Sequence, residues 1–415
     1  MKTERIETVV IGGGQAGLTM SLSLCALPHI VLERQRVAER WRSERWDSLH
    51  FQFPNWAMRL PDWAYQGDAP DAFATRDEVV AFIEAYAQRI DAPLRTGVDV
   101  RALRRAPDWD GFVLDTGHSV IEAANVVIAT GPYQQAVIPA AAQGIGAVFQ
   151  IPASGYRRPG QLPAGGVLVV GAGASGCQIA EELLRDGRPV YLSVGPHGRT
   201  PRRYRGRDMI WWVAALGLDE RTAQEISQPF RPSLLSGAYG GQTVDLRAFA
   251  AAGMVLIGHV LGARDGILSL ATDLAACLAE GDERYEDFIR NADAHVAATG
   301  IALAPEQEAA PRYPEPTTAI EPVETLDLRA AGITSVIWAT GYRYDFDWVD
   351  LDVFAPTVDS NQRRPEHVRG VTQQAGAYFL GLPLLHKMKS SFLSGVGDDA
   401  TYLAEQILAS GRCLG

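Results

Sequence analysis

The sequence TVVIGGGQAG spans residues 8–17 and decides the fold. A β-branched run that meets glycines is typical of a strand entering a tight turn, and Gly12, Gly14 and Gly17 have the spacing G-x-G-x-x-G. The first glycine permits the turn, the second lets a pyrophosphate approach the backbone, and the third lets helix and strand pack closely. Free N–H groups at the start of the helix, predicted over residues 15–27, can hold an anion. The stretch therefore predicts a dinucleotide-binding turn.

A carboxylate follows this turn at the spacing that a ribose needs. The next β-branched run ends at Glu33, 21 residues after Gly12. An acid at this distance accepts hydrogen bonds from the adenosine ribose of a dinucleotide. The residues predicted to bind the first dinucleotide are Gly12, Gly14, Gln15, Ala16, Gly17, Glu33 and Arg34.

The same pattern returns in the second part of the chain. VLVVGAGASG, residues 167–176, repeats the first turn, with its first glycine 159 residues later. VVIATG at residues 126–131 is likewise repeated by VIWATG at residues 336–341. This repetition predicts two dinucleotide-binding units built alike. The further cofactor-binding residues that it predicts are Thr130, Gly131, Gly171, Gly173, Ala174, Ser175, Gly176, Ala339, Thr340 and Gly341.

The second unit differs from the first at the residue expected to face the ribose. Ser193 stands where the first unit has Glu33, so no carboxylate repels a 2′-phosphate at this position. Five arginines lie within residues 199–207, and guanidinium groups bind phosphate well. We predict NADPH as the second dinucleotide, with Ser193, Arg202 and Arg203 at its adenosine end. A solvated basic loop is the alternative.

The short apolar runs show no alternation, as expected for strands of parallel sheets that are covered on both faces. The predicted fold is α/β, with two Rossmann-like, three-layer (ββα) dinucleotide-binding domains, the second inserted in the first. We place the first domain at residues 1–157 and 342–415. The second spans residues 158–341 and includes a helical substrate-access region around 207–305. Thr75 and Glu78 form a capping box before a helix that we interpret as scaffold.

Composition narrows the class of protein. The 415 residues are 47% hydrophobic and 21% charged, an ordinary globular mixture, and a net charge of −11 argues against nucleic-acid or anionic-membrane partners. The four cysteines lie far apart without a Cys-x-x-Cys pair, which argues against a redox dithiol or a zinc knuckle. With no signal peptide or long apolar run, we predict a cytoplasmic protein that binds no metal and acts on a small molecule. A homodimer remains open.

Two dinucleotides in one chain imply a hydride path, with FAD in the first unit and NADPH in the second. The turns, Trp41, Ser48-Leu49, Leu60-Pro61, ATGY at 339–342 and YFLGL at 378–382 together carry a resemblance. The chain resembles the flavin-containing monooxygenase superfamily, which includes N-hydroxylating, Baeyer–Villiger and plant indole-pyruvate monooxygenases. It departs from the family's linker motif, whose glycine and histidine are replaced at Val148 and Pro152, while Tyr156 is kept.

The resemblance implies a reaction. NADPH reduces FAD, the reduced flavin reacts with O2 to a C4a-(hydro)peroxyflavin, and one oxygen atom passes to a small organic substrate by N-, S- or carbonyl-type oxygenation. One alternative is an NADPH-dependent flavoprotein reductase or dehydrogenase that passes electrons to a non-oxygen acceptor. Another is a flavin-binding sensor without turnover.

The resemblance also places a polar amide beside the flavin. Counted from Ser48-Leu49, that catalytic amide is Gln52, with Asn55 as its competitor, and Trp41 belongs to the same segment. The four tryptophans within residues 41–63 form either an apolar wall around the flavin or ordinary core. Asp398 precedes a helix predicted over residues 400–409, either as its N-cap or at a helix start that faces the flavin.

Overall fold

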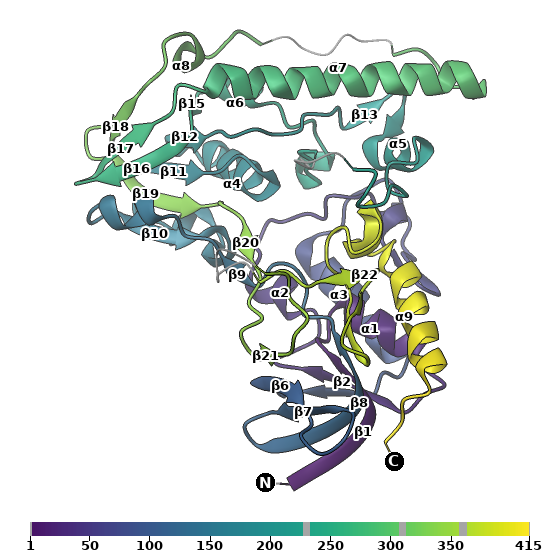
Figure 1. Cartoon of the computed structure of the whole chain (residues 1–415). Helices are drawn as coiled ribbons and strands as arrows, with labels where there is room; N and C mark the ends of the chain where they lie inside the picture. Colours follow the sequence, from purple (N-terminus) through teal and green to yellow (C-terminus); the bar gives the residue numbers. More distant parts are fainter. Residues whose placement is uncertain (1, 227–232, 307–312, 357–362, 415) are drawn as a thin grey trace.

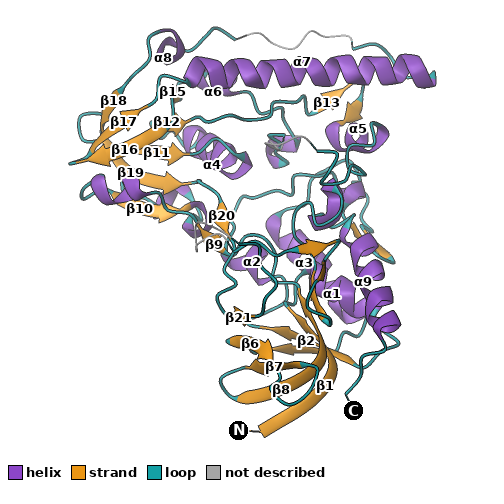
Figure 2. Cartoon of the chain, viewed as in Figure 1, coloured by secondary structure: helices purple, strands orange, loops and turns teal. Residues whose placement is uncertain are grey.

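The computed structural model describes residues 2–226, 233–306, 313–356 and 363–414 (Figure 1). Two sheets organise the chain, one in the lower and one in the upper part of Figure 1, and both termini lie in the lower part. Helices flank the sheets (Figure 2). The predicted α/β class is thereby confirmed.

The lower sheet has ten strands. β1 is central and pairs in parallel with β2 on one side and β8 on the other. The last part of the chain returns to this sheet, because β24 pairs in parallel with the end of β8. The strands are β1 (Lys2–Ile11), β2 (His29–Glu33), β5 (Leu94–Thr96), β6 (Ala102–Arg105), β7 (Phe112–Asp115), β8 (Ser119–Ile128), β21 (Val349–Asp350), β22 (His367–Val368), β23 (Val371–Thr372) and β24 (Ala377–Phe379).

The helices of the lower part are α1 (Gln15–Ser23), α2 (Glu39–Ser43), α3 (Arg76–Arg89) and α9 (Val396–Ser410). α1 packs against α9 and α3. The predicted helix over 15–27 is shorter, because α1 ends at Ser23 and turns lead to Pro28. The capping box of α3 is confirmed: the Thr75 hydroxyl accepts from the Glu78 N–H, and the Glu78 carboxylate accepts from the Thr75 N–H.

The upper sheet has five strands, all parallel, in the order β10-β19-β11-β12-β15. α4 (Ala174–Arg185) connects β11 to β12, as α1 connects β1 to β2. The order β19-β11-β12-β15 repeats the order β8-β1-β2-β5 of the lower sheet. The strands are β10 (Phe149–Pro152), β11 (Gly166–Val170), β12 (Val190–Ser193), β15 (Val255–Ile257) and β19 (Ile333–Trp338).

Two connections join the sheets. Their strands β9 (Gln135–Ala136) and β20 (Tyr342–Arg343) pair antiparallel with each other. β10 pairs with β19 in the upper sheet, so residues 149–152 belong to the second unit. The predicted end of the first domain segment at residue 157 therefore lies too late in the chain. The second unit begins with β10, whose pairing with β19 cannot be predicted from the sequence.

The predicted helical region around 207–305 is only partly helical. It contains α5 (Met209–Ala215), α6 (Leu246–Ala251) and α7 (Leu274–Thr299), the long helix across the top of Figure 2, but also the strands β15, β16 and β17. β17 pairs with β18, which follows later in the chain. The bounds of the other elements are β3 (Arg59–Leu60), β4 (Trp63–Ala64), β13 (Arg203–Tyr204), β14 (Arg207–Asp208), β16 (Val260–Arg264), β17 (Ile267–Leu270), β18 (Thr325–Asp327) and α8 (Thr317–Ile320). Among the described residues, no helix combines the length and apolarity that a bilayer crossing requires.

Six short 3-10 helices complete the described elements. They are η1 (Asn55–Ala57), η2 (Ala140–Gly144), η3 (Ala153–Gly155), η4 (Pro159–Gln161), η5 (Ala238–Gly240) and η6 (Met388–Ser391).

Candidate active site

The first glycine of each turn has a backbone conformation that favours glycine. The φ angle is +116° at Gly12 and +107° at Gly171. A Cβ would lie 2.5 Å from the backbone oxygen of Ala129 in the first turn and of Ala339 in the second. Because Ala129 follows β8 and Ala339 follows β19, each glycine turn lies directly against an ATG run, and the two repeated motifs form one site in each unit.

The second and third glycines of each turn have different roles. A Cβ at Gly17 or Gly176 would lie 1.8 Å from the backbone oxygen of the first glycine in the same turn. No atom lies within 4 Å of such a Cβ at Gly14 or Gly173. The third glycines therefore allow the helix to pack on the turn, while the second glycines leave the backbone open to a ligand.

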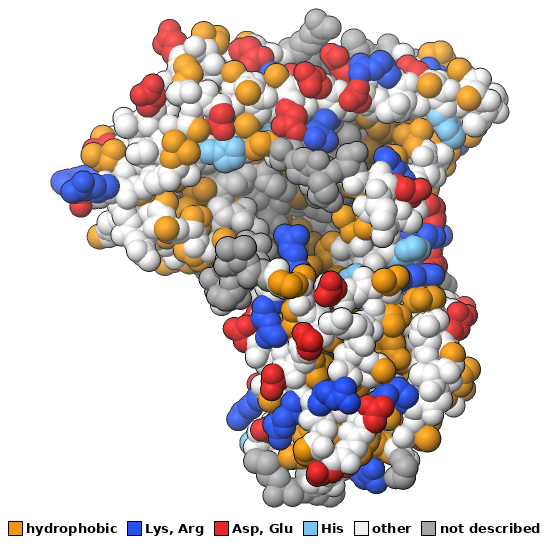
Figure 3. Space-filling model, in the orientation of Figure 1, with side chains coloured by type: hydrophobic (Ala, Val, Ile, Leu, Met, Phe, Trp, Pro, Cys, Tyr) orange, Lys and Arg blue, Asp and Glu red, His pale blue; other side chains and the backbone are white. Residues whose placement is uncertain are grey.

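One cavity of about 890 Å³ borders both turns. The space-filling view shows a hollow between the upper and lower parts of the molecule (Figure 3). The cavity therefore joins the first unit to the second. The predicted residues that line it are Gly12, Gly14, Gln15, Ala16, Glu33, Arg34, Trp41, Gln52, Thr130, Gly131, Gly173, Ala174, Ser175, Gly176, Ala339 and Gly341.

The Glu33 carboxylate is fixed at the end of β2. One oxygen accepts from the N–H of Gly13 (2.7 Å) and the other from the N–H of Gln35 (2.8 Å). These bonds hold the carboxylate at the cavity wall, and each oxygen retains a lone pair for a ribose hydroxyl. Across the turn, the Gln15 side chain donates to the backbone oxygen of Ser391 (2.7 Å), which ties the start of α1 to the loop before α9.

Aromatic side chains line the cavity between the turns. The ring centroids of Phe51 and Phe53 lie 5.4 Å apart, and Phe392 meets Phe53 edge-on at 5.1 Å. Trp41 contacts Phe51 edge-on at 6.0 Å. Phe392 is not among the residues predicted to line the cavity, and a loop more than 300 residues later in the chain brings it here.

Only part of the predicted tryptophan wall lies at the cavity. Trp41 and the buried Trp46 line it. Trp63 instead packs against Phe82 of α3, and Trp56 is exposed to solvent. Trp63 therefore belongs to the core, because the chain leaves the cavity edge after Phe53. For Trp41 and Trp46, the wall around the flavin stays a prediction.

The two predicted amides have different surroundings. Gln52 lines the cavity. Asn55 is buried, its Nδ2 donates to the backbone oxygen of Ala69 (3.0 Å), and it does not line the cavity. Asn55 thus orders the loop at the start of η1, and we withdraw it as a catalytic residue.

The arginine cluster does not face the cavity. Arg202 is 2% exposed, and its guanidinium donates to both carboxylate oxygens of Asp208 and to the backbone oxygen of Gln52 (2.7 Å). Arg203 donates to the backbone oxygens of Gly240 and Gly241. The sequence indicates no partner for these guanidinium groups, but in the structure a carboxylate and backbone carbonyl groups bind them. We therefore withdraw both arginines as phosphate ligands.

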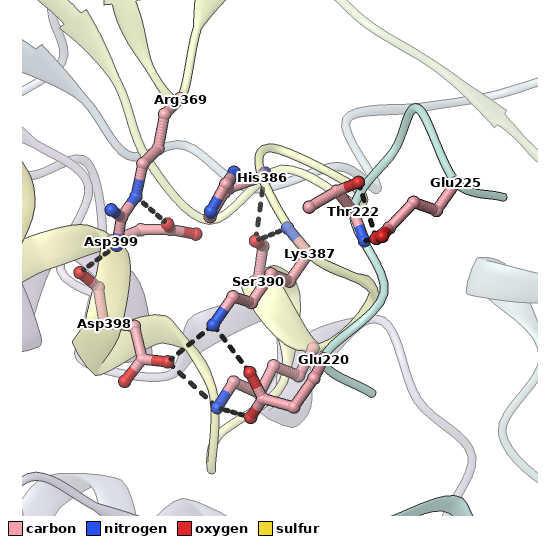
Figure 4. Close-up of polar contacts among 10 residues, drawn as sticks. Glu220, Thr222, Glu225, Arg369, His386, Lys387, Ser390, Asp398 and Asp399 are labelled. Atoms are coloured by element: carbon pink, nitrogen blue, oxygen red, sulfur yellow. Dashed lines mark hydrogen bonds and ion pairs between the residues drawn. The ribbon is translucent and has the colours of Figure 1, made fainter. Parts of the chain in front are cut away.

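Asp398 also lies away from the cavity wall. α9 begins at Val396 with Gly395 as its N-cap, so Asp398 is in the first turn and the N-cap interpretation is wrong. Its carboxylate pairs with Lys389 (2.9 Å), which also pairs with Glu220 (2.5 Å). Figure 4 shows Asp398 and Glu220 within this group of polar contacts. The cavity is bordered in this region by Ser391, Phe392 and Leu393.

A smaller cavity of about 320 Å³ lies beside the second turn. It is lined by Gly171, Ser193, Thr340 and, unforeseen from the sequence, His259. The Ser193 hydroxyl is buried and donates to the backbone oxygen of Gly258 (3.0 Å). The Thr340 hydroxyl donates to the backbone oxygen of Val137 (2.5 Å).

His259 is held by Asp273. Its Nδ1 is hydrogen-bonded to one carboxylate oxygen of Asp273, and its backbone N–H donates to the other (3.1 Å). Burial opposes ionisation of Asp273, but these hydrogen bonds outweigh it and lower the pKa of the carboxyl below its usual value. Cys277 lies near both side chains, yet three ligand atoms, two of them already hydrogen-bonded to each other, do not make a closed metal site.

Comparisons with known proteins agree with this site. Residues 9–214 match the family model described as pyridine nucleotide-disulphide oxidoreductase. A CzcO-like oxidoreductase of Geobacillus kaustophilus is 33% identical over 408 residues, which cover 97% of this chain and 98% of that protein.

Solved structures share the fold over nearly the whole chain. The flavin-containing monooxygenase from Stenotrophomonas maltophilia has a TM-score of 0.66 at 18% identity, covering 98% of this chain and 99% of that one. The bacillithiol disulfide reductase of Staphylococcus aureus has a TM-score of 0.60 at 13% identity (99% and 100% covered). OTEMO in complex with FAD and NADP has a TM-score of 0.54 at 17% identity (98% and 85% covered).

The fold and the paired glycine turns are those of flavin-dependent oxidoreductases, a class that contains both monooxygenases and disulfide reductases. Within this class, the chain belongs to the CzcO-like oxidoreductases.

Proposed function

We propose that the protein is a FAD-dependent monooxygenase that uses NADPH to insert one oxygen atom into a small organic substrate. The observation that carries the proposal is the single cavity that borders both glycine turns, since two dinucleotides bound there would meet inside it. The names of structural relatives support it: one is a flavin-containing monooxygenase, and another was solved with FAD and NADP.

The first turn, with Glu33 at the end of β2, is the proposed FAD site. The backbone at Gly14 is open to a pyrophosphate, and the N–H groups at the start of α1 would face it. The second turn, with Gly173 equally open, is the proposed NADPH site. The lower sheet would thus form a Rossmann-like FAD domain, interrupted by the NADPH domain of the upper sheet.

Bound FAD would supply the redox chemistry, in which NADPH, a proton, O2 and substrate give NADP⁺, water and the oxygenated substrate. The chain would provide the surroundings. Phe51, Phe53 and Phe392 form an apolar wall that excludes water from the reacting atoms. Gln52 would donate its amide N–H to the oxygen that develops negative charge, in the way that preorganised donors stabilise oxyanions.

Oxygen-18 labelling tests the function. Purified FAD-loaded protein, NADPH and ¹⁸O2 are combined with a panel of amines, thioethers, ketones and aromatic acids, and products are examined by mass spectrometry. We expect one ¹⁸O atom in the product of at least one class and the other in water. NADPH consumption with an electron acceptor in the absence of O2, and no labelled product from any class, would instead identify a reductase.

A further inference from the structure

The internal repeat indicates where His259 lies relative to the second dinucleotide site. In the lower sheet, Val98–Val100 follow β5 and line the large cavity on the Glu33 side. β15 has the position of β5 in the upper sheet, and His259 follows it to line the small cavity beside Ser193. Because Ser193 corresponds to Glu33, His259 lies at the adenosine end of the second dinucleotide site.

The described residues around this small cavity include one ionisable side chain, that of His259. The nearby arginines have other partners. Arg199 pairs with Asp245 and Asp282, and Arg205 pairs with Asp293. Arg202 and Arg203 are also engaged, Arg207 lies over the Trp211 ring, and no arginine of the cluster at 199–207 lines this cavity.

The two ring nitrogens of His259 have different surroundings. Nδ1 is bonded to Asp273, which leaves Nε2 for a ligand. A Cβ at Gly195 would lie 2.6 Å from Nε2, so Nε2 lies against the backbone two residues after Ser193. The residues that follow the second strand of such a unit meet the 2′ position of the ribose. The absence of a side chain at Gly195 makes room for the His259 ring.

We propose that His259, positioned by Asp273, is the residue that distinguishes NADPH from NADH. In the ring form with a hydrogen on both nitrogens, Nδ1–H donates to Asp273 and Nε2–H donates to the 2′-phosphate. The inference rests on the proposed function only in taking a nicotinamide dinucleotide as the second ligand. Since one imidazole beside a carboxylate is a weaker phosphate site than a pair of arginines, we expect a preference for NADPH of only about tenfold.

Binding of two fragments tests the inference without turnover. Adenosine 2′,5′-bisphosphate and 5′-AMP, which differ in the 2′-phosphate, are titrated into FAD-loaded protein by calorimetry. His259→Ala should weaken the bisphosphate about tenfold, the value of one charge-assisted hydrogen bond, and change the affinity for 5′-AMP less than about twofold. The exposed His118 supplies the matched control His118→Ala, and Arg203→Ala tests the competing arginine. Neither should change the ratio of affinities.

Three outcomes overturn the inference. Equal losses for both fragments in His259→Ala would mean that the ring contacts only the adenine. A loss of discrimination in Arg203→Ala, with His259→Ala unchanged, would return the role to the arginine loop. No binding of either fragment to the wild-type protein would contradict the second site itself, whereas the oxygen-18 experiment addresses oxygen transfer alone.

Discussion

At Gln52 the backbone and the side chain have separate partners. The backbone oxygen accepts from the buried Arg202, while the residue lines the large cavity. A side-chain substitution therefore removes the amide and leaves the bond that supports the loop. This separation makes the proposed donor testable without unfolding the protein.

Gln52→Ala should uncouple NADPH oxidation from oxygenation. Loss of one preorganised donor costs about 100-fold in rate in other enzymes, and we expect product per NADPH to fall at least about tenfold, with hydrogen peroxide formed instead. The exposed Gln66 gives the control Gln66→Ala. The ratio of product to NADPH, measured beside peroxide, checks the prediction, and unchanged coupling in Gln52→Ala would contradict the assigned donor.

At the scale of elements, a segment of the second unit docks on the loop before α9. Backbone N–H groups of Ala223, Met388 and Lys389 donate across the contact, at 2.9–3.2 Å. Glu220 pairs with Lys387 (2.6 Å), a residue labelled with it in Figure 4, and with Lys389 (2.5 Å). Hydrogen bonds from these two lysines lower the pKa of the Glu220 carboxyl.

Glu220→Gln should reduce stability in a pH-dependent way. A lowered pKa in the folded state gives stability that is present above the unfolded value of 4.5 and is lost as the pH falls through the folded value. We expect a loss of about 0.5–1 kcal/mol at pH 7, since the pair is half-exposed. Denaturant unfolding of both proteins at pH 7 and below pH 4.5 measures the difference.

This difference should disappear at acid pH. Glu321→Gln, at an exposed glutamate with no ion pair among the described residues, is the control and should match wild type throughout. A difference between Glu220→Gln and wild type that stayed constant with pH would show that the carboxylate charge is not its cause.

Local signals predicted some elements well. The capping box fixed the start of α3, because Thr75 and Glu78 satisfy each other's N–H groups within one turn. α9 starts four residues before the predicted 400, in a run of serine and glycine without a local cap. α9 packs against α1, and this contact cannot be predicted from the residues at the start of α9 alone.

At the scale of the whole molecule, the Glu182 carboxylate of the second unit accepts hydrogen bonds from both units. Tyr156 is fully buried, and its hydroxyl donates to the Glu182 carboxylate of α4 (2.7 Å). Ser48, between α2 and α3, donates to the other carboxylate oxygen (2.6 Å). Burial and the neighbouring Glu182 raise the pKa of Tyr156, so it stays a donor at neutral pH.

Tyr156→Phe should lower the free energy of unfolding by about 1–2 kcal/mol, because the Glu182 carboxylate loses a donor at a buried contact. Tyr313→Phe, at an exposed tyrosine, is the matched control and should stay within about 0.5 kcal/mol of wild type. Denaturant unfolding at pH 7 provides the measurement. Equal effects of both substitutions would mean that the Tyr156 hydroxyl does not help to hold the Glu182 carboxylate.

The sequence by itself determined both glycine turns, their ATG partners and the α/β class, because these depend on backbone conformations and spacings that lie within a few residues. Only the tertiary structure decided the partners of long side chains. Arg202 binds the nearby Asp208 carboxylate and the distant backbone oxygen of Gln52, and Arg203 binds backbone oxygens of residues 240 and 241. Phe392 and His259 line the cavities from distant parts of the chain. Charged groups bind the nearest complementary group in space, and that group is set by how the two sheets and their connections pack.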